Sequence, residues 1–137
     1  MKSVVMVCVT RQKNCARLIE LGARLAKKND KELLVVHALR KSDKVLGVGN
    51  EAEALERLFV QATDNGGSLM VVRSDDIASV LVSTAQKYNA SVIILGTTPA
   101  SEPVSLATRL RAMMPDMEII SVDGESSTGA FRISMNV

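Results

Sequence analysis

A chain of 137 residues with a net charge of +2 is long enough for one complete core and too short for two ordinary domains. Its composition, 47% hydrophobic and 23% charged, is typical of a soluble globular protein, and no apolar run approaches the roughly 20 residues that span a bilayer. Cys8, Cys15 and His37 are too few for a structural zinc site, and the two cysteines do not form a CxxC pair. With no secretory signal, the sequence predicts a cytoplasmic protein with reduced thiols and no metal.

The net charge hides an asymmetry along the chain. Residues 1–44 hold 11 Lys/Arg against 4 Asp/Glu, and residues 45–137 hold 6 against 11. A basic segment attracts anions, and nucleic acid is one candidate. The aromatic residues Phe59, Tyr88 and Phe131 do not interleave with the basic ones, so stacking platforms for a nucleic acid strand are missing. We therefore expect a phosphate on a small ligand or an acidic partner, and no nucleic acid or membrane.

Apolar runs alternate with stretches of helical periodicity along the chain. A run that is apolar at every position predicts a strand buried on both faces, whereas apolar residues three and four apart predict an amphipathic helix. The strands predicted in this way cover residues 4–9, 33–38, 69–72, 91–95 and 118–122, and the helices cover about 15–26, 51–62, 77–88 and 102–114. Strict alternation requires right-handed crossovers and therefore a parallel sheet with helices on both faces.

Short polar residues mark the helix starts in this pattern. The predicted caps are Asn14, Asn50 with Glu53 three residues on, one of Ser74, Asp75 and Asp76, and Ser101. Asp75 and Asp76 could also form a carboxylate pair for acid–base chemistry or magnesium. Adjacent residues at a helix start point in different directions, however, which favours capping.

The last 15 residues differ from the rest of the chain. Residues 123–129 are rich in turn-forming residues, and residues 130–135 alternate as an edge strand does. We divide the chain into an α/β domain over residues 1–122 and a C-terminal tail over residues 123–137. The tail strand either folds back on the fifth strand or is exchanged with a partner, and the seven-residue loop is long for a tight hairpin, which favours exchange.

Ligands of such a sheet bind outside the carboxyl ends of the strands, where the strand order reverses. Those ends are residues 10–14, 37–41, 73–76 and 96–101. The candidate ligand-binding residues on them are Thr10, Arg11, Gln12, Lys13, His37, Gly96, Thr97, Thr98 and Ser101.

Two interpretations are open for several of these residues. Arg11 and Lys13 either bind a phosphate beside a helix start, where backbone amides favour an anion, or are simply solvated. Cys15 near that helix start could be a reactive thiol, but its apolar helical position favours core packing. His37 could contact a nucleotide or sense pH, and local hydrogen bonding is the more frequent use. Ser101 could hold phosphate through its hydroxyl, and helix capping is the simpler role.

The stretches VVMVCV (residues 4–9) and ASVIILG (residues 90–96), in this order of elements, resemble the universal stress proteins over about residues 2–122. Residues 15–19 and 106–119 are similar to one subgroup, the stress-protein domain of potassium-responsive sensor histidine kinases. With no kinase or membrane segment attached, we expect a free-standing version. The resemblance implies a three-layer α/β/α sandwich of the adenine nucleotide alpha hydrolase type, with a five-stranded parallel sheet in order 3-2-1-4-5; the tail can add a further edge strand.

ATP-binding members of that family carry Gly, two residues, Gly, nine residues, and then Gly followed by Ser or Thr. Gly96 matches the first glycine, but Pro99 stands at the second and Arg109-Leu110 at the last pair. Thr10 replaces the acidic residue that such members carry near the adenosine. Because proline has no N–H and a bulky ring, it removes an amide donor and blocks close approach to a phosphate. We therefore expect no ATP binding in the usual manner.

No nucleophile, base and orienting group stand together in the sequence, so we expect no enzyme. We interpret the chain as a non-catalytic regulatory or sensor domain in stress or ion-homeostasis signalling, with an unidentified protein partner. The resemblance implies a homodimer through the fifth strand, whose edge carries no Lys or Pro to prevent pairing. The alternative is a nucleotide sensor for AMP, ATP or a cyclic dinucleotide between the first and fourth strands; an adenine nucleotide is the one cofactor expected.

Overall fold

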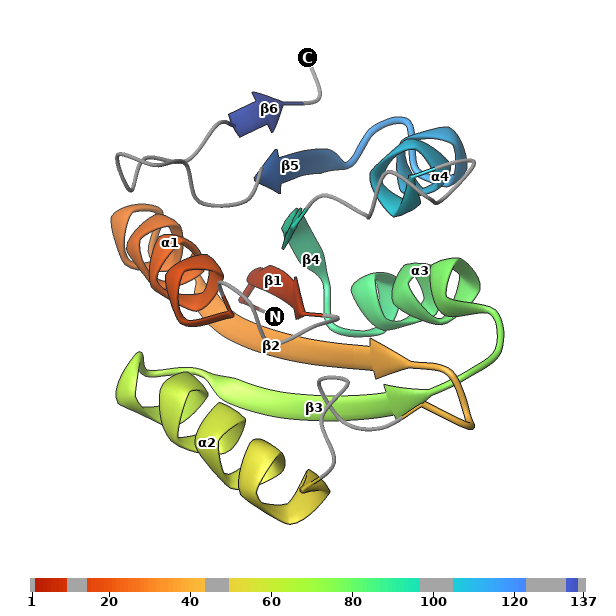
Figure 1. Cartoon of the computed structure of the whole chain (residues 1–137). Helices are drawn as coiled ribbons and strands as arrows, with labels where there is room; N and C mark the ends of the chain where they lie inside the picture. Colours follow the sequence, from red (N-terminus) through yellow and green to blue (C-terminus); the bar gives the residue numbers. More distant parts are fainter. Residues whose placement is uncertain (1, 10–14, 44–49, 97–104, 123–132, 136–137) are drawn as a thin grey trace.

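The structure is a computed structural model that describes residues 2–9, 15–43, 50–96, 105–122 and 133–135. Six strands form one sheet in the order β3-β2-β1-β4-β5-β6 (Figure 1). The first five strands are parallel, and β6 is antiparallel to β5, so the predicted order 3-2-1-4-5 is confirmed. In chain order the elements are β1 (Val4–Val9), α1 (Cys15–Lys28), β2 (Glu32–Leu39), α2 (Glu51–Asp64), β3 (Ser68–Arg73), α3 (Ile77–Lys87), β4 (Ala90–Gly96), α4 (Leu106–Met113), β5 (Glu118–Val122) and β6 (Ile133–Met135).

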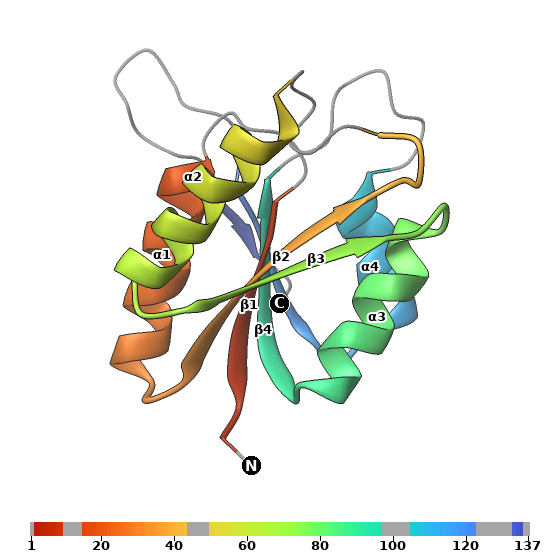
Figure 2. The ribbon, with the colours of Figure 1, turned by 90° about the horizontal axis from the view of Figure 1, so that it is seen from below.

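Helices cover both faces of the sheet. Figure 2 shows α1 and α2 on one side and α3 and α4 on the other. Alternate residues of β1 face the two layers: Val5 and Val7 pack with α1 and α2, whereas Met6 and Cys8 pack with α3 and α4. This double burial explains why the strand is apolar at every position. Among the described residues, no helix is long and apolar enough to cross a bilayer.

Two of the predicted helix caps are confirmed. The Asn50 side chain accepts a hydrogen bond from the backbone N–H of Glu53 at 3.1 Å, and its amide donates to the Glu53 carboxylate at 3.2 Å. Asp76 caps α3 by accepting from the backbone N–H of Ser79 at 3.2 Å. These side chains satisfy amide groups that have no partner within the helix. The predicted cap Asn14 lies outside the described residues.

The start of α4 was predicted wrongly. The helix begins at Leu106, and its cap is Ser105, whose hydroxyl accepts from the backbone N–H of Thr108 at 3.1 Å. Ser101 therefore does not cap this helix. The buried residues Ala107 and Leu110 give the helix its apolar face, and the Ser105 cap fixes its start.

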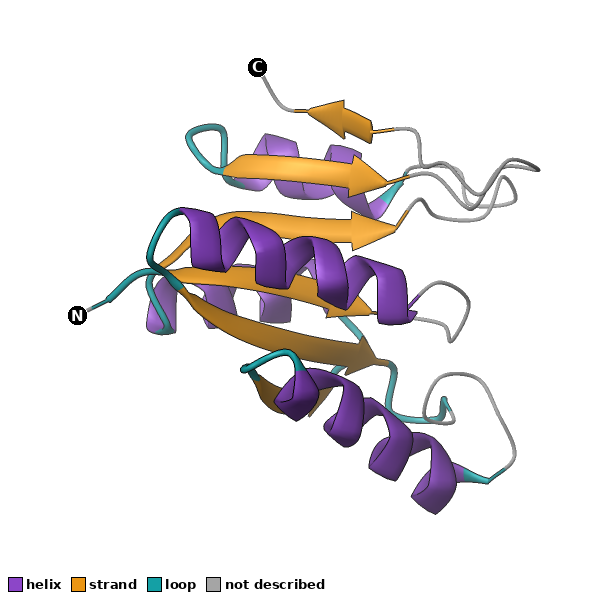
Figure 3. Cartoon of the chain, turned by 90° about the vertical axis from the view of Figure 1, so that its left-hand side faces the viewer, coloured by secondary structure: helices purple, strands orange, loops and turns teal. Residues whose placement is uncertain are grey.

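The C-terminal strand lies beside β5 of the same chain. The Cα partners are Ile120 with Met135, Ser121 with Ser134, and Val122 with Ile133. Figure 3 shows this short strand at one end of the sheet, running against the direction of β5. The single chain thus adopts the fold-back arrangement that the loop length argued against, while exchange with a partner stays a prediction.

Gly22 allows α1 to lie close to the sheet. A Cβ atom at this position would overlap Cγ2 of Val7 on β1 and lie 3.1 Å from Cδ1 of Leu33 on β2. A side chain here would therefore push the helix away from the middle of the sheet. The close approach fixes α1, and with it the helix start that follows β1.

We expect Gly22→Ala to lower the free energy of unfolding by about 1–3 kcal/mol, because overpacking outweighs the helix propensity of alanine. In a Val7→Ala background, which removes the opposing methyl, the same change should cost much less or stabilise the protein. Urea unfolding of the four chains measures this coupling. Equal effects of Gly22→Ala in both backgrounds would contradict the close contact.

The pairing of β6 is testable with the double variant Ser121→Cys/Ser134→Cys. Directly opposed residues of antiparallel strands have Cα atoms about 4.5–5.5 Å apart, within the range for a disulfide. We expect mild oxidation to link the two positions within one chain, seen on a non-reducing gel as a monomer that migrates faster than its reduced form. Each single variant is a control, and a dimer linked only in the double variant would instead show that the tail is exchanged.

Candidate functional site

The strand order reverses between β1 and β4. The chain builds outward from β1 through β2 to β3, and then returns to place β4 on the other side of β1. Cys8 and Leu95 are Cα partners, so the carboxyl ends of β1 and β4 lie side by side. Ligands of open parallel sheets bind at such a reversal, which makes this edge of the sheet the candidate site.

The described part of the site is limited. The candidates Thr10, Arg11, Gln12, Lys13, Thr97, Thr98 and Ser101 lie outside the described residues. His37 and Gly96 are described: His37 lies within β2, two residues before its end at Leu39, and Gly96 is the last residue of β4. The chain leaves the sheet after Val9 and after Gly96, so the segments that hold the other candidates start from neighbouring strand ends.

His37 links the ends of two central strands. Its side chain has 0% exposure, and its Nδ1 atom is 2.8 Å from the carbonyl oxygen of Val9, to which it donates. A carbonyl can only accept, so Nδ1 carries the proton in this arrangement. The bond provides a partner for a carbonyl at the end of β1, just before the segment that holds Thr10 to Lys13. A role for His37 in ligand binding stays a prediction.

The environment of His37 favours its neutral form. Burial lowers the pKa of the imidazole, the hydrogen bond with Val9 raises it in part, and the positive charge of Arg73 lowers it further. The net shift of the pKa is downward from 6.5. The ring is therefore neutral at pH 7 and acts as a hydrogen-bond donor through Nδ1.

The surroundings of Gly96 do not by themselves require glycine. A Cβ atom here would lie 3.6 Å from Cδ1 of Leu18 and 3.9 Å from the carbonyl oxygen of Val122, which are ordinary contacts. Crowding by these neighbours therefore does not explain the residue.

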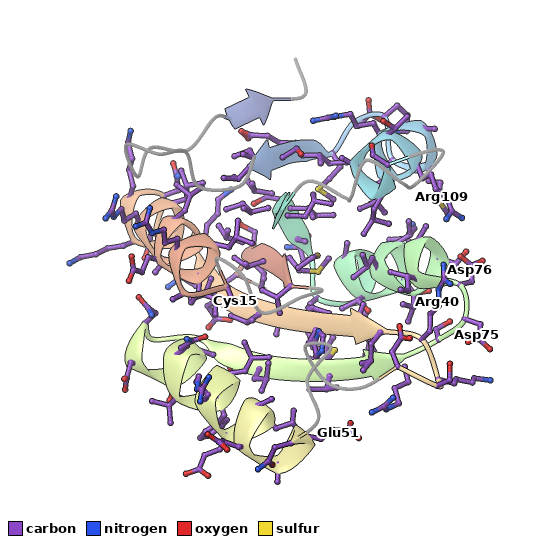
Figure 4. All side chains as sticks on the ribbon, in the orientation of Figure 1. Cys15, Arg40, Glu51, Asp75, Asp76 and Arg109 are labelled. Atoms are coloured by element: carbon purple, nitrogen blue, oxygen red, sulfur yellow. The ribbon has the colours of Figure 1, made fainter. Side chains whose placement is uncertain are left out.

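Arg109 and Leu110 do not lie at the start of a helix, where backbone amides could meet a phosphate. Both residues are inside α4: Leu110 has 0% exposure, and Arg109 lies 4.0 Å from the Asp76 carboxylate at the start of α3 (Figure 4). Assigning them to the last pair of the phosphate loop by residue count was therefore wrong. The residue at the start of α4 is Ser105, and the Ser105-x-x-Thr108 spacing was the signal that could have shown it.

Both cysteines are core residues. Cys8 and Cys15 are buried, and burial raises the pKa of Cys8 to about 12 and that of Cys15 to about 11. The helix start beside Cys15 does not overcome this desolvation. Thiolates are scarce at such pKa values, so neither side chain is a nucleophile at neutral pH.

Arg73 is a residue whose role the sequence did not indicate. Its Nη1 atom donates to the carbonyl oxygens of Asp43 at 2.8 Å and Lys41 at 3.2 Å, and its Nη2 atom lies 3.1 Å from the Glu51 carboxylate. Asp75 adds a longer bond from the Lys41 N–H at 3.4 Å. Arg73 thereby ties the turn after β2 to the start of α2, and its charge is used within the fold.

The carboxylates and thiols of the described residues do not gather into a metal site. Within the described ranges, no group of three His, Cys, Asp or Glu residues comes together. Asp76, which sequence analysis considered for magnesium, accepts hydrogen bonds from the N–H and hydroxyl of Ser79. These bonds lower the pKa of its carboxyl group, which matches its role as a helix cap.

Comparison with known proteins identifies the family. The sequence model described as the universal stress protein family matches residues 1–107. The chain belongs to this family. Sensor protein KdpD of Mycobacterium tuberculosis is 34% identical over 97 residues, which are 71% of this chain and 11% of KdpD. The chain thus spans about a tenth of that relative, and the predicted resemblance to a sensor protein is confirmed.

Solved structures agree on the fold. The universal stress protein of Archaeoglobus fulgidus has a TM-score of 0.66 at 18% identity, over 88% of this chain and 93% of that one. A universal stress protein in complex with cAMP also has a TM-score of 0.66 at 14% identity, over 88% of this chain and 97% of that one. The Archaeoglobus fulgidus protein in complex with dAMP has a TM-score of 0.59 at 18% identity, over 88% of this chain and 98% of that one. At these identities the likeness concerns the fold alone.

His37 is the one histidine in the sequence, so its titration can be followed without ambiguity. Because its folded pKa lies below the unfolded value of 6.5, its contribution to stability is complete above that pH and is lost as the pH falls through the folded pKa. We expect the Hε1 resonance to titrate below pH 6.5. The free energy of unfolding should fall between about pH 7.5 and about pH 5.5.

The matched control is His37→Asn, whose side-chain amide can also donate to the Val9 carbonyl. This variant should be less stable than the parent near pH 7.5 but should show a smaller pH dependence over the same range. A midpoint at or above pH 6.5 for His37, or the same slope in both proteins, would show that burial does not control this group.

Proposed function

We propose that this chain is a non-catalytic regulatory domain of the universal stress protein family that does not bind ATP through a glycine-rich loop. The observation that carries this proposal is the sequence that follows β4. Gly96, the last residue of this strand, is followed by Thr97-Thr98-Pro99, and the next described helix begins at Leu106. A triphosphate needs several converging amide donors, and one glycine followed by a proline does not supply them.

The start of α4 gives further support. A helix N-terminus can bind a phosphate through its unpaired amides and a nearby hydroxyl. Here the Ser105 hydroxyl already accepts from the Thr108 amide and lies 2.7 Å from the Thr108 hydroxyl. Glu102, in the segment before it, adds a negative charge that opposes an anion.

The proposal that the domain is non-catalytic rests on the chemistry of the described side chains. The imidazole of His37 is buried and bonded to Val9, and both thiols have a raised pKa. Among the described residues, neither thiol is therefore poised as a nucleophile, and His37 is not poised as its base. A regulatory role in cytoplasmic stress or ion-homeostasis signalling, with a protein partner, agrees with a relative that is named a sensor protein.

We also propose that the protein acts as a homodimer. A contact through the edge of β5 requires β6 to be displaced or exchanged, because β6 pairs with β5 from Ile120 to Val122. The paired cysteines at positions 121 and 134 test that exchange.

A nucleotide sensor is the second candidate function. Two structural neighbours are described as complexes with cAMP and dAMP, which each carry one phosphate. A single phosphate needs fewer amide donors than a triphosphate. It would therefore be compatible with a loop that supplies only a few such donors. The ligand would lie at the reversal between β1 and β4, with Arg11 and Lys13 on one side and Gly96, Thr97 and Thr98 on the other.

Isothermal titration with ATP and magnesium, AMP and cAMP tests both candidates. We expect a dissociation constant for ATP weaker than about 10 μM, which corresponds to about −7 kcal/mol. If AMP or cAMP binds, Arg11→Ala/Lys13→Ala should weaken binding and flatten its salt dependence.

The variant Lys27→Ala/Lys28→Ala removes the same charge from the last turn of α1, at its far end, and should leave affinity unchanged. ATP binding tighter than about 10 μM would overturn the argument from the loop. Equal losses in the two double variants would place the nucleotide elsewhere.

A further inference from the structure

Strand β3 is the last described strand at one end of the sheet. This strand pairs with β2 from Ser68 to Arg73 without a register shift, and no described strand pairs with its other side. Figure 1 shows β3 and α2 at the end of the sheet that lies opposite β6. Proteins usually protect such an edge with lysine, proline or a bulge, and the sequence Ser-Leu-Met-Val-Val-Arg contains none of them.

Exposed apolar side chains gather at the same end. Val71 on β3 is 38% exposed, and Phe59 and Val60 on α2 are 54% and 45% exposed. Helix α2 packs on β3. Among the described residues the other large hydrophobic side chain exposed to this degree is Met113, which lies on α4 in the opposite layer. A patch of this kind beside an unpaired edge marks an interaction surface.

We propose that this end of the sheet binds a second copy of the chain, with the two β3 strands antiparallel about a two-fold axis. An axis perpendicular to the sheet keeps each helix layer on its own side, so opposed residues must point to the same face. Leu69 packs with the α1 and α2 layer, whereas Met70 and Val72 pack with the other layer. Val71 faces the same way as Leu69, because side chains alternate along a strand.

One register satisfies this rule with matched side chains. When the two-fold axis passes between the two Met70 residues, Leu69 of each copy lies opposite Val71 of the other. Both of these cross-strand pairs are apolar. Centring the axis on Val71 would instead place Leu69 opposite Arg73. In the Met70 register Arg73 lies opposite Gly67, and its charge is already paired with Glu51 at 3.1 Å. No like charges face each other along the paired strands.

The two α2 helices would meet above this pair of strands. Phe59 lies five residues before the end of α2, about 7.5 Å along the helix. Met70 lies two residues after the start of β3, about 6.6 Å along the strand, and the strand runs back along the helix. Phe59 therefore lies at about the same height along the strand as Met70, through which the proposed axis passes. A single extended peptide would pair with the strand but leave Phe59 uncovered, which favours a second copy.

Disulfide trapping tests the register in the full-length chain. Met70→Cys should form a linked dimer on mild oxidation, because the axis brings the two copies of this position together. The parent has only the buried thiols Cys8 and Cys15, so it should not link. Met113→Cys is the matched control: it lies on α4, which packs on β5 at the other end of the sheet, and it should also stay unlinked. A folded Met70→Cys chain that does not link, or equal linking of Met113→Cys, would overturn the proposal.

Light scattering and sedimentation at about 100 μM give the second measurement. Val71→Lys places a charge at the edge and should weaken association by more than about tenfold, and it should also prevent linking through Met70→Cys. If Val71→Lys does not fold, Phe59→Lys takes its place in the test. Its helix position is already exposed, and it should weaken association in the same way. Met113→Lys, with a similar exposure in the parent, should associate like the parent. A monomeric parent, or unchanged association of both lysine variants, would reject this interface.

Discussion

The burial of β1 on both faces and both edges is the constraint on which the rest of the structure depends. Its six residues are all buried, and it pairs with β2 on one side and β4 on the other. Neighbouring residues face opposite layers, so one short strand contributes to both core clusters. The contact of Gly22 with Val7 then sets how close α1 lies. The reversal of strand order follows from this central position.

The same strand connects the core to the candidate site. The carbonyl of Val9 accepts from the buried His37, which joins the ends of β1 and β2. At the neighbouring strand end, Arg73 ties the turn after β2 to the start of α2. The groups that often carry out chemistry, an imidazole and a guanidinium, are thus used to fix strand ends and turns. The candidate binding residues that follow Val9 and Gly96 lie outside the described residues, and their role stays a prediction.

The two ends of the sheet differ in a way that bears on association. At one end β6 is paired with β5, which occupies part of the edge through which dimerisation was expected. At the other end no described strand lies beyond β3, whose Val71 is exposed, and the neighbouring helix α2 exposes Phe59. An edge without a described neighbouring strand and exposed apolar side chains thus occur together at the β3 end. The short C-terminal strand changes which edge is open and leaves the central fold unchanged.

Local patterns in the sequence determined the parallel strands, the alternation with helices and the caps Asn50 and Asp76, because periodicity and capping depend on residues only a few positions apart. The strand order came from family resemblance, and Gly96 was correctly placed at the end of β4, whereas β2 continues two residues beyond His37 to Leu39. Tertiary structure alone decided that the tail returns to β5, that Arg109 belongs inside α4, and that Arg73 pairs with Glu51 across 22 residues. Such contacts join groups whose spacing in the chain carries no period, so only the folded chain brings them together.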